Sequence, residues 1–242
     1  MGRGAERQRQ RGAGDEELIR PHGGYRQLKT FQLATVIYDV TARFCEKYLD
    51  PRSRTVDQMT QAARSGRQNT AEGSVDSGTS RKIEMKLTGV AKGSLEELRL
   101  DYEDYLRQRS LPQWAADHPA LGRFKALRCA SLDVFRRWVA DEMKRAAQDG
   151  RNTDRHGRTR TAENDAARVR HSPCSSVPPP RPSATPPCPS VFVANGALSL
   201  LNLCIYLLDR QLKAQAAAFE RDGGFTERLY SKRTRARREK RN

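Results

Sequence analysis

The chain has 242 residues, of which 45 are Lys or Arg and 29 are Asp or Glu, and its formal net charge is +16. Apolar residues make up only 36% of the sequence, which is low for a chain that folds throughout, so part of it is expected to be disordered. Such an excess of cations is tolerated most easily beside an anionic partner, of which nucleic acid is the commonest. The alternative explanation is that the excess charge serves only to keep the protein soluble.

Cysteine usage and hydropathy narrow the class of protein. The five cysteines are odd in number and have no CxxC or His–Cys spacing, so we expect neither a zinc site nor a disulfide framework, and a cytoplasmic location fits them. The first residues, MGRGAERQRQRGAG, lack the apolar core of a secretory signal. The most apolar stretch, Val191 to Leu208, is interrupted by Asn195 and Gly196, among others. A buried amphipathic helix is therefore favoured there over a membrane span, and no membrane partner is expected.

The N-terminal part of the chain is divided by composition. Residues 1–24 are rich in Arg, Gly and Gln and are predicted to form a disordered basic arm. Residues 25–149 are predicted to form the first part of a helical bundle. In its first helix, apolar residues recur every three or four positions from Tyr25 to Leu49, and Asp50-Pro51 ends the helix.

Three more helical segments are predicted before residue 150. The second helix runs from Ser53 to about Glu72, and Gly73 is interpreted as the residue that terminates it. Ser77, Thr79 or Ser80 is expected to cap a long third helix from about Arg81 to Arg109. A further amphipathic stretch from about Ala120 to Ala147 breaks its spacing near Ser131, which favours two shorter helices.

The C-terminal part contains an insertion, a last helix and a tail. Residues 150–190 are Arg-rich and then Pro-rich, without a periodic apolar face, and are predicted to be a disordered insertion. Residues 191–230 are predicted to hold the last bundle helix, ended by Asp222-Gly223-Gly224, with one further turn from Phe225 to Tyr230. Residues 231–242 form a basic tail. Four or five helices without a convincing strand predict an all-α helical bundle.

Several short pieces resemble a known family. The pieces are Asp57-Gln58 followed by Ala62-Ala63, then Ala71-Glu72-Gly73, then Gly93-Ser94-Leu95-Glu96-Glu97-Leu98. They resemble the bacterial four-helix bundle family that includes the 23S rRNA intervening-sequence proteins. Residues 193–238 resemble the extension of four helix bundle suffix domain proteins. The sequence departs from the family pattern at residues 66–70, where relatives tend to have apolar residues, and in its insertion.

The resemblance implies an up-and-down four-helix bundle without recognised catalytic residues. It also implies ring-like homo-oligomers, which are pentamers in known relatives. One member of the family that the chain resembles is the accessory protein of diversity-generating retroelements. The resemblance to it implies a basic, ring-shaped oligomer that binds nucleic acid and a reverse transcriptase.

The sequence shows no arrangement typical of an enzyme. His22, His118, His156 and His171 fall in predicted arm, loop or insertion segments, which do not fix the geometry that a general base requires. Glu97 and Asp101 share a helix face, but without an ExxH motif a solvated face is favoured over a metal site. We predict a non-enzymatic protein with no catalytic, cofactor-binding or metal-binding residues; a carboxylate metal enzyme in the bundle core is a lesser alternative.

Two sets of basic residues are the candidate nucleic-acid contacts. The C-terminal set, opposed only by Glu239, is Lys232, Arg233, Arg235, Arg237, Arg238, Lys240 and Arg241. The bundle set lies around the turn between the second and third helices, where a patch is expected: Arg64, Arg67, Arg81 and Lys82, with Lys86. Phosphate contacts of this kind release counterions, so binding is expected to weaken steeply with salt.

No aromatic residues are interleaved with these sets, so sequence-specific recognition of RNA or DNA is not expected. A solvated tail without a specific partner is one alternative. The other is a protein-interaction scaffold that docks a partner such as a polymerase or a reverse transcriptase.

Overall fold

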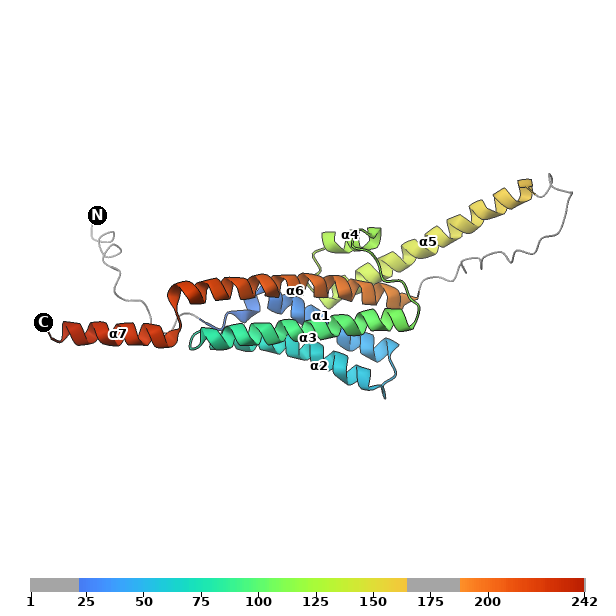
Figure 1. Ribbon diagram of the computed structural model, residues 1–242. Helices are drawn as coiled ribbons and strands as arrows, with labels where there is room; N and C mark the ends of the chain where they lie inside the picture. The colour runs from blue at the N-terminus through green and yellow to red at the C-terminus, as the bar shows by residue number, and fades with distance from the viewer. Residues whose placement is uncertain (1–21, 165–187, 242) are drawn as a thin grey trace, which may run out of the picture.

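A computed structural model describes residues 22–164 and 188–241, and all the regular structure in these residues is helical (Figure 1). The helices in chain order are η1 (Tyr25–Gln27), α1 (Lys29–Tyr48), α2 (Arg54–Asp76), α3 (Arg81–Gln108), α4 (Pro119–Ala126), α5 (Leu132–Asn164), α6 (Pro189–Asp222) and α7 (Phe225–Glu239). The predicted all-α fold class is therefore confirmed.

Four helices, α1, α2, α3 and α6, form the body of the bundle. α1 packs against α2 and α6, and α3 packs against the same two helices, so the four form a closed ring in cross-section. α3 and α6 run antiparallel, because Arg81 at the start of α3 contacts Ala218 whereas Lys92 contacts Asp209. The up-and-down order of all four helices stays a prediction.

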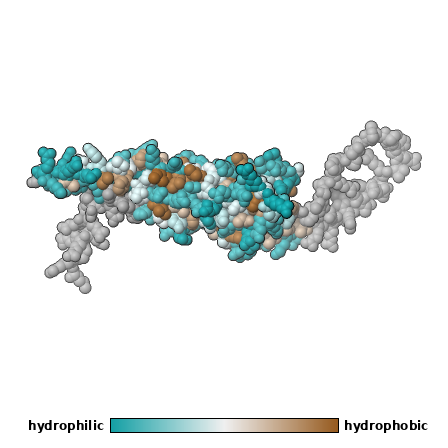
Figure 2. Space-filling view, turned by 90° about the horizontal axis from the view of Figure 1, so that it is seen from below, coloured by the Kyte–Doolittle hydropathy of each residue, from teal (hydrophilic) through white to brown (hydrophobic). Residues whose placement is uncertain are grey.

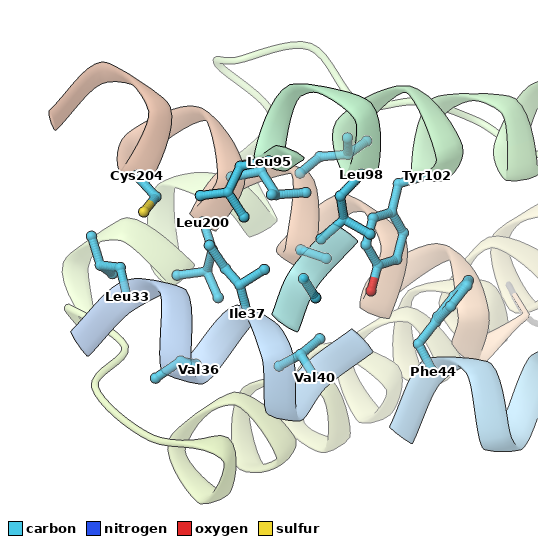
Figure 3. Packing of buried hydrophobic residues seen from close by; sticks show 14 of the residues in the cluster. Leu33, Val36, Ile37, Val40, Phe44, Leu95, Leu98, Tyr102, Leu200 and Cys204 are labelled. Carbon is cyan, nitrogen blue, oxygen red and sulfur yellow. The ribbon is translucent and has the colours of Figure 1, made fainter. Parts of the chain in front are cut away.

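The core lies between α1, α3 and α6 and consists of aliphatic and aromatic side chains at helical spacing (Figure 3). α1 contributes Leu33, Ile37 and Phe44, all of which are buried. Tyr102 of α3 is fully buried, and its hydroxyl donates a hydrogen bond of 3.1 Å to Thr41 of α1. A buried hydroxyl without a partner would be costly, so this bond lets an aromatic ring fill the centre of the bundle.

Apart from Met59, the residues that α2 buries are small, which lets it approach α3 closely. A Cβ atom placed on Gly66 would lie 2.5 Å from Cδ2 of Leu95, and one on Gly73 would lie 3.3 Å from the carbonyl oxygen of Glu84. The prediction that Gly73 terminates the second helix is wrong, because α2 continues to Asp76 and Gly73 is buried within it. At this position glycine provides room for the neighbouring helix, not a positive φ.

The caps of the bundle helices follow the expected chemistry. The Ser53 side chain accepts a hydrogen bond from the N–H of Thr55, and that of Ser80 accepts one from the N–H of Ile83. Both serines thereby satisfy a backbone donor that the first turn of a helix leaves without a partner. Ser80 is thus the cap among the three candidates for the third helix.

α4 and α5 lie on the outside of the ring, and the break predicted near Ser131 separates them. Phe135 and Trp138 of α5 pack onto α6 at Gly196, where a Cβ atom would lie 2.6 Å from the Trp138 ring. α5 extends to Asn164, beyond the predicted end at Ala147 and into the segment assigned to the insertion. The rest of that insertion up to Pro187, like the arm before His22, lies outside the described residues.

The segment Pro189–Glu239 contains the one stretch among the described residues that is long and apolar enough to cross a membrane. Within its most apolar window, 67% of the residues are buried in the bundle. The core helix of a soluble protein passes the same test, so this stretch is only weak evidence for a span.

Candidate nucleic-acid interface

α7 is the most basic helix and projects beyond the end of the four-helix ring (Figure 1). None of its residues is buried. In the space-filling view, this end of the molecule is hydrophilic, whereas apolar patches lie over the bundle (Figure 2). The helix therefore presents its side chains to solvent on nearly all sides.

The predicted C-terminal set lies on this helix or directly after it, so the tail is helical from Phe225 to Glu239 and not only for one turn. Arg, Lys, Ala, Leu and Glu are good helix formers. Glu227 also accepts a hydrogen bond of 2.9 Å from the N–H of Gly224, which caps the first turn. Helix propensity and the capping glutamate are both visible in the sequence, but the tail lacks the periodic apolar residues that predict an amphipathic helix.

Most of the cations on α7 are not neutralised by nearby carboxylates. Arg235 pairs with Glu239 at 3.1 Å, and both side chains are more than 60% exposed, so this ion pair is weak. The other six members of the C-terminal set, four on α7 and two directly after it, have no acidic partner in the part of the chain that the structure describes: Lys232, Arg233, Arg237, Arg238, Lys240 and Arg241. Their charge is available to an external anion.

The junction between α6 and α7 is built from Gly223-Gly224 and Arg81. Gly223 has a φ of +64°, a conformation that glycine adopts without strain, and its N–H donates to the carbonyl of Phe219. The Arg81 guanidinium donates to the carbonyl of Ala218 at 2.6 Å and pairs with Asp222 at 3.4 Å. Only 11% of the Arg81 side chain is exposed. Arg81 therefore fixes the end of α6 and is not part of the exposed basic surface.

The bundle set does not form one patch, so that prediction is wrong. The Arg67 guanidinium lies 4.3 Å from the ring centre of Tyr38, on the side of the ring where α1 meets α2. Its neighbour Gly66 faces Leu95, 14 residues after Arg81, which corresponds to about 21 Å along α3. Arg81 faces α6 instead, on the opposite side of the bundle. The register between α2 and α3, which the sequence does not reveal, separates these residues.

The exposed members of the bundle set fall into two groups, with Lys82 and Lys86 on α3 apart from Arg64 on α2. Lys82 is exposed beside Arg81, at the end of the bundle from which α7 projects. Lys86 is exposed one turn further along α3. Arg64 is exposed on α2, about 5 Å from the level of Arg67 along the helix. Lys82, next to Arg81 in the chain, is the exposed member of the set that lies nearest to the α6–α7 junction.

His118 has a fixed geometry, contrary to the expectation for a loop residue. Its Nδ1 atom accepts a hydrogen bond of 3.3 Å from the N–H of Ala120 and caps α4. Its ring stacks on that of Trp114, with the ring centres 4.3 Å apart. Both interactions organise the loop before α4, so His118 has a structural role in this arrangement.

Carboxylates gather in a polar groove between α2 and α3, lined by Asp57, Glu97 and Asp101. Burial raises the pKa of Asp101, and the charges of Asp104 and Glu97 raise it further. Among the described residues, no group of three His, Cys, Asp or Glu side chains is arranged to hold a metal ion.

Comparisons with known proteins do not assign the chain to a family. No protein-family model matches it, and searches of curated proteins and of solved structures return no match. The resemblance to the four-helix bundle family therefore stays a prediction based on the short pieces named above.

Proposed function

We propose that the protein is a non-enzymatic helical bundle of the cytoplasm that binds nucleic acid through phosphate contacts made by α7. The observation that carries this proposal is an exposed helix on which four cations have no acidic partner among the described residues, followed directly by two more, Lys240 and Arg241. The 15 residues of α7 extend about 22 Å, and duplex DNA presents one phosphate charge per ~1.7 Å. One helix can thus face several phosphates at once.

Contacts of this kind do not distinguish bases, so the proposed binding is independent of sequence. Tyr230 is 73% exposed and is the aromatic residue of α7 closest to the cations. Phosphate binding alone predicts that replacing this ring has little effect, whereas stacking on bases predicts a loss of affinity for single strands.

Replacement of Lys232, Arg233, Arg237 and Arg238 by Gln tests the proposal. Fluorescence anisotropy with labelled RNA and DNA at low salt is expected to show binding by the unmodified protein and a large loss in this variant. A control with the same change in net charge replaces exposed cations elsewhere on the bundle: Lys47, Lys86, Arg136 and Lys144. The control and Tyr230→Ala are expected to retain binding. Failure of the unmodified protein to bind either nucleic acid would refute the proposal.

Exposed apolar side chains favour a second candidate function, a scaffold that docks a protein partner such as a polymerase or reverse transcriptase. Ile83, Val90 and Leu100 of α3 are each more than 40% exposed. The same side chains suit the homo-oligomer that the resemblance implies. If a partner remains bound after nuclease treatment and after removal of residues 231–242, the scaffold function is favoured over nucleic-acid binding.

A further inference from the structure

A cavity lies away from α7, between the start of α1, the loop before α4, α4 itself and α6. It has a volume of about 730 Å³, within the range of about 300–1,000 Å³ that is usual for small-molecule sites. Its walls include the buried side chains of Leu33, Leu121, Phe124 and Leu198, which come from three different helices. The interior is therefore suited to an apolar body.

The charged residues of this cavity are all cations. Lys29, Lys125 and Arg128 line it and are exposed, and no Asp or Glu is among its lining residues. Two other cavities in the described part of the chain differ in this respect. The one between α1 and α5 contains Glu46, and the groove between α2 and α3 is mainly acidic. Charge complementarity thus favours an anion at this cavity in particular.

The wall beside Trp114 is held in place by Asn195, which is 2% exposed. Its Oδ1 atom accepts a hydrogen bond of 2.7 Å from the N–H of Trp114, and its Nδ2 atom donates to the carbonyl of Pro112 at 3.0 Å. A buried amide that bridges a helix and a loop fixes the loop against α6. The cavity is therefore formed in advance of any ligand, which reduces the entropic cost of binding.

Two of the cations are positioned by the backbone around them. Lys125 donates a hydrogen bond of 2.8 Å from Nζ to the carbonyl of Ala116. Arg128 has a φ of +46°, in the left-handed region that side chains other than glycine rarely adopt. Backbone conformations of this type cluster at ligand sites. Glycine would satisfy this turn with less strain, so the turn alone does not account for arginine.

We propose that this cavity binds an aliphatic monocarboxylate, with its chain against the leucines and Phe124 and its carboxylate between Lys125 and Arg128. This site is independent of the phosphate contacts proposed for α7. Dodecanoate is a suitable probe, and dodecan-1-ol has the same chain without the charge. Isothermal titration calorimetry with the full chain is expected to show saturable 1:1 binding of dodecanoate and at least tenfold weaker binding of the alcohol. Equal affinity for the two would overturn the role of the cations.

Arg128→Gly separates a ligand-binding role from a structural one. The variant relieves the backbone strain at the positive φ of residue 128, so the melting temperature is expected to stay the same or rise. It also removes the positive charge, so dodecanoate affinity is expected to fall about tenfold. Lys125→Gln is expected to weaken binding similarly. Arg136→Gln, at the cavity between α1 and α5, is the matched control and should bind as the unmodified protein does. Unchanged affinity in Arg128→Gly and Lys125→Gln would contradict the proposal.

The location of the chain is tested by Ser199→Trp, which places a bulky ring inside the cavity from α6. Loss of dodecanoate binding with an unchanged circular dichroism spectrum is the expected result, and retained binding would exclude this site.

Phosphatidylglycerol vesicles distinguish a free carboxylate from a lipid surface. The proposal expects dodecanoate to bind without vesicles; binding to vesicles but not to monomeric dodecanoate would overturn it. Nucleic-acid affinity should be unchanged in all these variants.

Discussion

Gly66 has a role that its position in the sequence does not reveal, because the same residue type serves turns and close packing. The side chain of Leu95 from α3 occupies the space that a Cβ atom on Gly66 would take. Leu95 is fully buried and has little freedom to move away. The run of small residues at Ala62, Ala63 and Gly66 is consistent with this close approach of α3, although it does not show which helix approaches. Gly73, about two turns further along α2, has the same role, although its place before a Ser/Gly-rich turn predicts a helix end.

Replacing Gly66 by Ala is expected to lower the free energy of unfolding by up to about 2 kcal/mol. Overpacking a core costs about 1–3 kcal/mol, and the better helix propensity of Ala offsets about 1 kcal/mol of that. Gly93→Ala is the control, because no neighbouring atom lies within 4 Å of its Cβ position. That variant is expected to be more stable by up to about 1 kcal/mol in the same urea unfolding experiment. Equal effects at the two positions would contradict the close packing of α2 and α3.

The raised pKa of Asp101 makes the stability of the folded protein depend on pH. Because its pKa is raised, the folded protein binds this proton more tightly than the unfolded chain does. Its contribution to stability is therefore present below the ordinary pKa of 3.8 and is lost as the pH rises through the folded pKa. Asp101→Asn removes this loss and is expected to be more stable than the unmodified protein near pH ~7. Urea unfolding below about pH 3.5 should show no such advantage; an advantage independent of pH would argue against ionisation as its cause.

At the scale of elements, α4 is joined to α5 by an ion pair. Arg123 donates from Nε to Oε1 of Glu142 at 2.6 Å and also reaches Oε2, and the Glu142 side chain is only 4% exposed. This bidentate geometry holds two helices that are separated by the break near Ser131. The break itself was predicted from spacing, whereas the pairing of residues 19 positions apart was not, because it depends on how the two helices fold back.

Arg123→Met tests the contribution of this ion pair to stability. It leaves the buried Glu142 carboxylate without its closest partner and is expected to cost on the order of 1–3 kcal/mol of unfolding free energy. The double variant with Glu142→Leu is expected to recover most of that loss, since the carboxylate is then absent as well. A double variant no more stable than Arg123→Met, in thermal unfolding, would show that Arg123 acts mainly through other contacts.

The helices of the ring follow from the sequence more directly than the basic helix does. α3 begins and ends within one residue of its predicted bounds, because Ser80 caps it and the apolar spacing continues to Tyr105. α7 lacks a buried apolar face, so periodicity, the main signal of an amphipathic helix, was weak there. For the same reason its helical form depends on capping and helix propensity instead of on packing.

On the scale of the whole molecule, the basic C-terminal set lies at one end and the cavity proposed for a carboxylate lies alongside the bundle. Charge counting located the first of these from sequence alone. The sequence does not reveal the second, because Lys29 is far in the chain from Lys125 and Arg128, and only the packing of α1 and α4 against α6 brings the three together. The patch expected around the turn between α2 and α3 does not form, because the fold separates Arg64 and Arg67 from Arg81 although they are near in the sequence.

The dependence of nucleic-acid affinity on salt concentration tests the central claim most directly. If α7 contacts phosphates, the logarithm of the affinity for duplex DNA should fall linearly with the logarithm of the salt concentration, with a slope of about −0.9 per contact. Replacing Lys232, Arg233, Arg237 and Arg238 by Gln should make that slope shallower by about four, roughly one per cation, while the control variant on the bundle keeps it. An equal slope in both variants would contradict the claim that α7 holds the phosphates.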